Sequence, residues 1–157
     1  MSTQSRLIGE FEVSVDAKGR IMMPAALKRQ LPPDAHDKLV INRGFEKCLV
    51  LYPITEWDRQ SAEVNKLNMY VQANRDFARY FFRGATELTL DNVNRFLVPK
   101  SLLEYAEVEK EAILFAFLDR IELWSKSKYQ QQMNEAPQDF SSLAEKVMGG
   151  AKGNDVP

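Results

Sequence analysis

The pattern of apolar and polar residues occurs twice along this chain. Residues 9–24 match residues 84–99 at a constant offset of 75 positions, without an insertion or deletion. The identical pairs at this offset are Gly9 and Gly84, Glu12 and Glu87, Asp16 and Asp91, Arg20 and Arg95, Pro24 and Pro99, and Leu27 and Leu102. Apolar positions between these pairs also meet apolar positions, which indicates two copies of one structural unit.

Each copy predicts the same series of short elements. Val13 and Val15 alternate with polar residues, which is typical of a strand with one buried face. A tight Asp-x-x-x-Arg loop follows, and the apolar runs 21–23 and 96–98 then predict strands that are buried on both faces. Short helices are expected after the two prolines, at 25–31 and 100–106, and further strands at 39–41, 49–52, 112–115 and 121–124.

The two copies span residues 9–53 and 84–125, and helices are expected between and after them. Within the intervening residues 54–82, apolar residues such as Trp57 and Val64 recur at helical spacing. The sequence alone leaves open whether these helices cover the strands of their own chain or face a neighbouring subunit.

Neither copy is expected to fold alone, because a unit of about fifty residues buries too little apolar surface. The two copies are therefore expected to intertwine into a single domain, residues 1–157, whose strands close into one double-psi-like barrel without exposed edges. The predicted fold class is α+β, mainly β, with helices between and after the repeats. Residues 135–157, which end in a glycine-rich polar stretch, are expected to form a flexible tail.

The two Asp-x-x-x-Arg loops carry the chemistry that points to a nucleic acid. Arg20 and Arg95 offer planar guanidinium groups that grip a phosphate or the edge of a guanine. Asp16 and Asp91 are expected to cap backbone N–H groups and to hold the arginines in position. Lys18 adds a further positive charge to the first loop. The alternative is that each Asp and Arg pair only ties its own turn together.

These features together resemble the MraZ transcriptional regulators, which are relatives of the AbrB-type swapped-hairpin DNA-binding proteins. The resemblance rests on Asp-Ala-Lys-Gly-Arg-Ile-Met-Met-Pro at 16–24, on the second Asp-x-x-x-Arg motif at 91–95, and on their spacing. It extends over residues 9–129. It implies a swapped-hairpin fold, assembly into rings, and binding of short repeated DNA elements upstream of the cell-division and cell-wall gene cluster that contains the protein's own gene.

The resemblance also implies which residues contact DNA. The loop residues carried over from the family are Asp16 with Arg20 and Asp91 with Arg95, and Lys18 completes the predicted site. The second loop departs from the family pattern, because Asn94 replaces the usual glycine and Val93 replaces a polar residue. The second loop is therefore expected to bind DNA more weakly than the first.

The overall charge limits how such a protein can bind DNA. The formal net charge is -1 and the sequence pI is about 5.9, which counts against coating nucleic acid by bulk charge. Binding is therefore expected to come from locally concentrated Lys and Arg. Assembly into a higher homo-oligomer would then raise the avidity of weak individual contacts.

Other classes of protein and site find little support in the sequence. The single cysteine, Cys48, and the single histidine, His36, are too few for an internal disulfide or an ordinary zinc cluster. Glycine-rich phosphate loops and nucleophile-elbow motifs are absent, so we expect no enzyme, no cofactor, no metal, no small-molecule substrate and no deep polar pocket. With no apolar run of about eighteen residues, the protein is expected to be cytoplasmic and nucleoid-associated, not membrane-bound. The alternative function is an AbrB-like protein-interaction or antitoxin-type module for which DNA binding is secondary.

Overall fold

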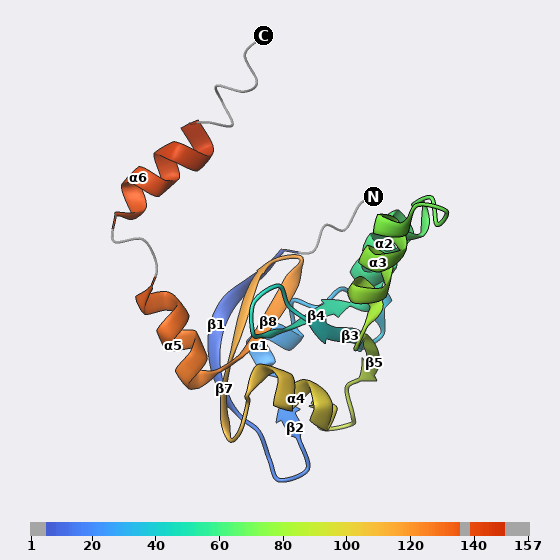
Figure 1. Ribbon diagram of the computed structural model, residues 1–157. Coiled ribbons are helices and arrows are strands. Elements are labelled where there is room, and N and C mark those ends of the chain that lie inside the picture. Colours follow the sequence, from blue (N-terminus) through green and yellow to red (C-terminus); the bar gives the residue numbers. More distant parts are fainter. Residues whose placement is uncertain (1–5, 136–138, 150–157) are drawn as a thin grey trace.

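The computed structural model describes residues 6–135 and 139–149, and the two copies form matching strands and helices in the same order, apart from one short turn in the first copy (Figure 1). The first copy consists of β1 (Leu7–Ser14), β2 (Arg20–Met22), α1 (Ala25–Lys28), the short 3-10 turn η1 (Pro33–Ala35), β3 (Lys38–Arg43) and β4 (Leu49–Pro53). The second copy consists of β5 (Thr86–Thr89), β6 (Arg95–Leu97), α4 (Lys100–Ala106), β7 (Glu111–Leu118) and β8 (Arg120–Ser125). Helices α2 (Ile54–Asn65) and α3 (Gln72–Phe82) follow the first copy, and α5 (Lys126–Asn134), α6 (Phe140–Ala144) and a π-helical turn (Glu145–Gly149) follow the second.

The strands of the two copies interleave in one antiparallel sheet of order β1-β7-β8-β4-β3-β5. The first strand of each copy pairs with the third strand of the other copy, so that β1 lies beside β7 and β5 lies beside β3. The last strands, β4 and β8, pair with each other at the centre. Exchanging the two copies reproduces the same strand order, which gives the sheet an approximate two-fold symmetry. Each copy therefore lacks part of its own sheet without the other.

The predicted closing of the strands into a double-psi-like barrel is not confirmed. The sheet is not closed, and β1 and β5 are its two edges among the described strands. The short strands β2 and β6 leave this sheet and pair with each other as a separate two-stranded ribbon. The reason lies in their pairing: β2 and β6 take each other as hydrogen-bond partners and therefore do not bridge the two edges of the sheet. The α+β class with intertwined repeats describes the structure, whereas the closed barrel does not.

The core lies between the sheet, the ribbon and the short helices. Ile21 and Phe96 face each other across the ribbon and are fully buried, as are Leu27 on α1 and Leu102 on α4. Each of these residues has its counterpart in the other copy at the 75-residue offset. The repeated apolar pattern thus produces a core in which both copies contribute equivalent side chains.

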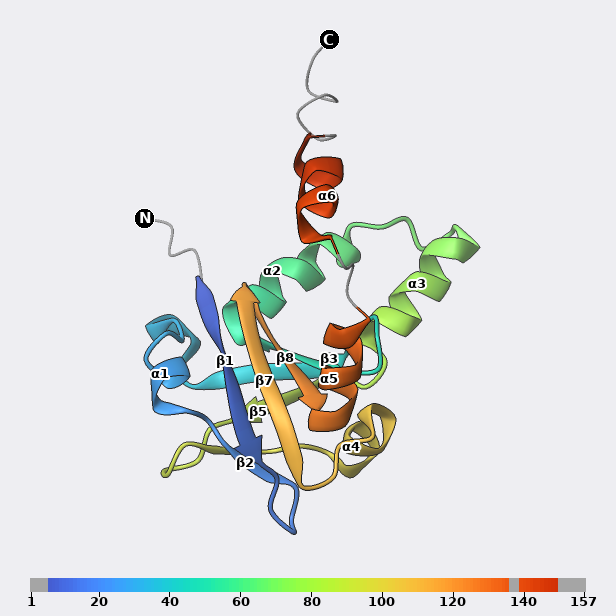
Figure 2. The ribbon, with the colours of Figure 1, turned by 90° about the vertical axis from the view of Figure 1, so that its left-hand side faces the viewer.

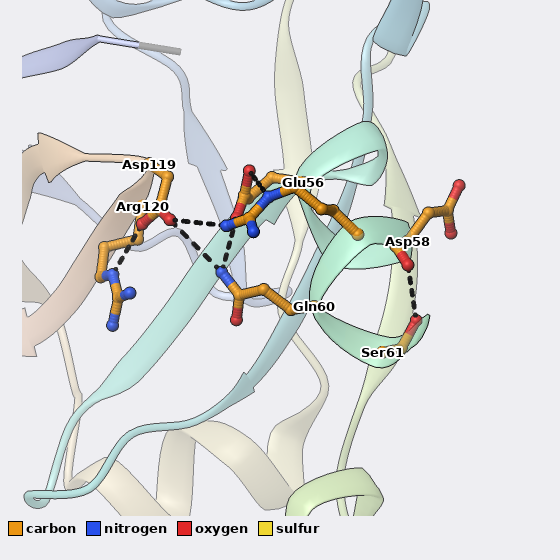
Figure 3. A network of polar contacts seen from close by, with 7 residues as sticks. Glu56, Asp58, Gln60, Ser61, Asp119 and Arg120 are labelled. Atoms are coloured by element: carbon orange, nitrogen blue, oxygen red, sulfur yellow. Dashed lines mark hydrogen bonds and ion pairs between the residues drawn. The ribbon is translucent and has the colours of Figure 1, made fainter. Parts of the chain in front are cut away.

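Polar contacts attach α2 to the turn between β7 and β8 (Figure 3). Arg59 pairs with Glu56 on its own helix and reaches Asp119 at 3.6 Å, and Arg120 Nε lies 3.0 Å from the same aspartate. Burial raises the pKa of Asp119, but the hydrogen bond from Arg120 and neighbouring groups more than offset this, so its pKa lies below the ordinary value. The helix after the first copy is thereby fixed to a turn of the second copy.

The segment after α5 was expected to be flexible over 135–157. Within that segment the structure describes α6 and the π-helical turn, which project away from the sheet (Figures 1 and 2). Residues 136–138 and 150–157 lie outside the described residues, and the flexibility of the tail stays a prediction. Among the helices that are described, none combines the length and the apolar character needed to cross a membrane.

Replacing Phe96 by alanine is expected to lower the free energy of unfolding by about 3–5 kcal/mol, because Phe96 is 1% exposed at the centre of the ribbon. The matched control is Leu97→Ala on the same strand, whose side chain points outward and should cost no more than about 0.5 kcal/mol. Urea unfolding of the two variants at one protein concentration checks this. Equal losses for both variants would contradict the described orientation of β6.

Candidate nucleic-acid interface

The first Asp-x-x-x-Arg loop connects β1 to β2 and is folded around the carboxylate of Asp16. One carboxylate oxygen accepts hydrogen bonds from the backbone N–H groups of Lys18 at 2.9 Å and Arg20 at 2.8 Å. The other oxygen accepts a hydrogen bond from Nε of Arg20 at 2.8 Å. The backbone N–H of Gly19 donates to the carbonyl of Asp16 at 2.9 Å. One side chain therefore fixes both the path of the loop and the direction of the arginine.

The second loop, between β5 and β6, repeats this geometry around Asp91. Its carboxylate accepts hydrogen bonds from the backbone N–H groups of Val93 at 3.0 Å and Arg95 at 2.8 Å, and from Arg95 Nε at 3.0 Å. The backbone N–H of Asn94 donates to the carbonyl of Asp91 at 2.9 Å. The predicted capping by the two aspartates is confirmed in both copies, and contact of these loops with DNA stays a prediction.

Gly19 and Asn94 give the two loops the same backbone turn. Their φ angles are 86° and 65°, in the left-handed region that glycine adopts freely and asparagine tolerates. The asparagine in the second copy therefore keeps the loop intact. If the second loop binds DNA more weakly than the first, the cause has to lie in its side chains.

The two loops are held by each other's strands. The backbone N–H of Val98 donates to the carbonyl of Gly19 at 2.9 Å, and that of Met23 donates to the carbonyl of Asn94 at 2.8 Å. These bonds extend the ribbon at both ends, and Figure 2 shows the first loop (blue) at the lower end of the molecule and the second loop (olive) at its lower left. The relative position of the two loops is therefore set by backbone pairing between the copies.

The ribbon presents a mixed basic and apolar outer face. Arg20 lies opposite Leu97, and Arg95 lies opposite Met22, while the residues between them point into the core. Met22 is 57% exposed and Leu97 is 55% exposed. The sequence prediction that both strands are buried on both faces is therefore wrong. Their outward apolar side chains were missed because a run of three apolar residues hides the alternation of a strand with one exposed face.

The arginines of both loops keep hydrogen-bonding capacity for a ligand. Only Nε of Arg20 and of Arg95 is engaged, and the terminal guanidinium nitrogens make no hydrogen bond to any part of the chain that the structure describes. Both side chains are about one third exposed. Each arginine is thus fixed at its base and free at its tip, which lowers the entropy lost when the tip binds an anion.

The aspartates remain anionic in this setting. Backbone hydrogen bonds from Arg20 and Arg95 are the main cause that holds the pKa values of Asp16 and Asp91 below the ordinary value. Each aspartate therefore neutralises part of the arginine charge. In the first loop the exposed Lys18 adds a second cation, whereas the equivalent position of the second loop carries Val93.

Away from the ribbon, the structure has a cavity of about 450 Å³ beside α3, lined mainly by aromatic side chains together with arginines and glutamates. The sequence predicted no deep polar pocket, and this partly apolar cavity was not foreseen. Near it, possible ligand atoms of Glu46, Cys48 and Glu122 lie within 4.8 Å of one another. Burial, with the two carboxylates nearby, raises the pKa of the Cys48 thiol to about 12, so the thiol is protonated at neutral pH.

Comparison with known proteins identifies the family. A family model described as "MraZ protein, putative antitoxin-like" matches the chain twice, at residues 7–80 and 81–149. The chain belongs to the MraZ family. The predicted resemblance is confirmed, and the two matches divide the chain where the internal repeat divides it.

Similar proteins carry the name "Transcriptional regulator MraZ". One from Christiangramia forsetii is 44% identical over 144 residues, which cover 91% of this chain and 93% of that protein. One from Flavobacterium psychrophilum is 39% identical over 95% of this chain and 96% of its own length, and one from Clostridium beijerinckii is 40% identical over 89% and 95%. MraZ is thus a family of transcriptional regulators and not of enzymes, in agreement with the sequence prediction.

Substitutions at the left-handed position of the two MraZ loops should differ in their effect on stability. Gly19→Ala forces a side chain into a φ of 86°, with its Cβ 3.2 Å from the carbonyl of Val98, and should cost about 1–3 kcal/mol of unfolding free energy. Asn94→Gly keeps the conformation and should change stability by less than about 1 kcal/mol. Chemical denaturation measures both, and a Gly19→Ala variant as stable as the wild type would count against the described loop.

Proposed function

We propose that this MraZ family member regulates transcription by binding double-stranded DNA sequence-specifically through the outer face of the β2–β6 ribbon and its two loops. The observation that carries the proposal is the pair of equivalent arginines, each fixed by its own aspartate, on one two-stranded antiparallel ribbon. The major groove of B-DNA admits such a ribbon, and arginine is the commonest partner of guanine there.

The side chains of this face divide into two kinds of contact. Lys18 is exposed and suited to a phosphate, a contact that positions the protein without reading sequence. Arg20 and Arg95 are suited to guanine edges or phosphates. The outward Met22 and Leu97 offer apolar contacts of the kind that recognise the methyl group of thymine. A face that combines these groups discriminates between sequences better than a purely basic one.

Assembly into a ring-like homo-oligomer is the second part of the proposal. With a net charge of -1, a single subunit is expected to bind DNA weakly. Several subunits that present loops to successive DNA elements gain avidity of about 10²–10⁴ over one contact. Following the family resemblance, the proposed targets are repeated elements upstream of the cell-division and cell-wall gene cluster that contains the protein's own gene. Such a protein would be associated with the nucleoid.

The double variant Arg20→Ala/Arg95→Ala is expected to lose about 10-fold or more in affinity for a duplex from immediately upstream of the protein's own gene, because each bidentate contact contributes about 1–3 kcal/mol. Fluorescence anisotropy over a salt series measures this, with a scrambled duplex beside the native one. The matched control is Lys66→Ala, which removes an exposed cation at the C-cap of α2. If the double variant binds DNA as tightly as the wild type, the Asp and Arg pairs only stabilise their own turns.

Adding a cation to the second loop should increase its affinity for DNA. Val93→Lys restores the charge that Lys18 provides in the first loop, and we expect tighter binding with a salt slope steeper by about 1 for each added phosphate contact. The control is Asn65→Lys, which adds the same charge at the end of α2, far from the ribbon (Figure 1). Equal gains from both variants would mean that net charge, and not the loop, governs binding.

A second candidate is an antitoxin-type module that acts mainly on a partner protein. The matched family model is described as antitoxin-like, which supports this candidate. Its distinguishing sign is one stoichiometric partner protein, together with an affinity for DNA that does not depend on Arg20 and Arg95.

A further inference from the structure

Two surfaces of the chain are built for packing and have no partner within the described residues. The first is the helical segment 140–149, formed by α6 and the π-helical turn. Its large apolar residues Phe140 and Leu143 on α6, and Val147 in the π-helical turn, are all exposed. Figures 1 and 2 show α6 projecting away from the sheet, so this face is not covered by the body of its own chain.

The second surface is the aromatic groove, the cavity of about 450 Å³ between the β3–β4 loop, α3 and β8. Trp57 and Phe81 stack at its base, with ring centroids 5.3 Å apart. Phe45 and Tyr80 stand at its rim and are 96% and 72% exposed. Large aromatic side chains left in water at the mouth of an apolar cavity are typical of an interaction surface.

The charges of the two surfaces are complementary. Arg43, Arg83 and Arg120 outnumber the two glutamates among the residues that line the groove. Nε of Arg43 is buried and finds no hydrogen-bond partner in the described part of the chain. The helical segment carries Asp139 at its N-cap and Glu145 in its turn, against a single lysine. With its N-cap, the helical segment therefore carries a net negative charge, and the lining of the groove carries a net positive one.

The internal duplication gives an independent reason to connect the two surfaces. The first family match includes α2 and most of α3, and the second includes α5 and α6. Helix α6 thus occupies the place in the second copy that α3 occupies in the first. Helix α3 stacks the half-buried Phe81 on Trp57 of α2, whereas the large apolar residues of α6 are exposed. As the counterpart of α3, helix α6 is expected to pack against an aromatic surface.

We propose that the helical segment 140–149 of one subunit docks into the aromatic groove of a neighbouring subunit, as an amphipathic helix in an apolar groove. Because the helix and the groove are different surfaces, this contact is head-to-tail, and repeated contacts close into a ring or continue as an open chain. The inference rests on the proposed ring-like assembly and names the surfaces that form it.

Cysteine cross-linking tests the contact directly. The only native cysteine, Cys48, is fully buried and its thiol has a raised pKa, so it need not be removed. We expect that neither the Leu143→Cys protein nor the Tyr80→Cys protein forms a covalent dimer alone. Mixed and oxidised, the two should give one covalent dimer. The chain that carries both substitutions should give a ladder of covalent oligomers. Lys66→Cys, mixed with Leu143→Cys, is the control and should give no dimer.

Mass measurement tests the consequence for assembly and for DNA. The variant Phe140→Ser/Leu143→Ser should reduce the oligomer mass in light scattering and weaken binding to a multi-element duplex about 100-fold. Its affinity for a single element should stay within about 2-fold of the wild-type value, because the loops are untouched. Ser141→Ala, on the same helix, is the control and should leave both mass and affinity unchanged.

Two results would overturn the inference. A cross-link formed only within one chain means that the helix covers its own groove, and an unchanged mass of Phe140→Ser/Leu143→Ser means that other surfaces hold the oligomer. Both leave the proposed DNA binding in force if Arg20→Ala/Arg95→Ala still loses affinity. Loss of the cross-link together with DNA binding that ignores the loops would instead reject the proposed function as well.

Discussion

The pairing of β2 with β6 joins strands of only three residues, yet it determines how the two copies fit together. Ile21 and Phe96 meet at its centre, and a backbone hydrogen bond at each end joins a loop to the other copy's strand. The ribbon therefore fixes the core and the loops at once. Every one of these contacts joins one copy to the other. A substitution that disturbs one loop is therefore expected to disturb the strand that supports the other loop.

Much of this arrangement follows from the sequence. The 75-residue offset predicts the paired elements, and the residues of the Asp-x-x-x-Arg motif predict the capping that the structure contains. The closed barrel is not confirmed, because the direction of a strand after a tight turn depends on tertiary pairing that a local pattern does not report. The outward orientation of Met22 and Leu97 was hidden for a similar reason: apolar residues on an exposed face break the alternation that marks a surface strand.

The Asp-x-x-x-Arg loops of the two copies share one backbone turn but differ in charge. Asn94 preserves the left-handed turn of Gly19, but Val93 stands where the first loop has a lysine. The helices differ as well, since α3 packs on its own chain and α6 does not. In one copy the apolar residues of the last helix pack on their own chain, and in the other copy they are exposed. Such a duplicated scaffold can be both a stable subunit and an element of a larger assembly.

The interleaved sheet also sets the order in which this chain can fold on the ribosome. Residue Leu7 of β1 pairs with Leu118 of β7, so the first strand emerges long before its partner exists. At about 5–20 residues per second, synthesis of the residues between them takes about 6–22 seconds. During this time β1 is an open edge, and its polar residues Glu10, Glu12 and Ser14 make it a poor template for aggregation. The alternation of β1 thus protects the nascent chain as well as the folded one.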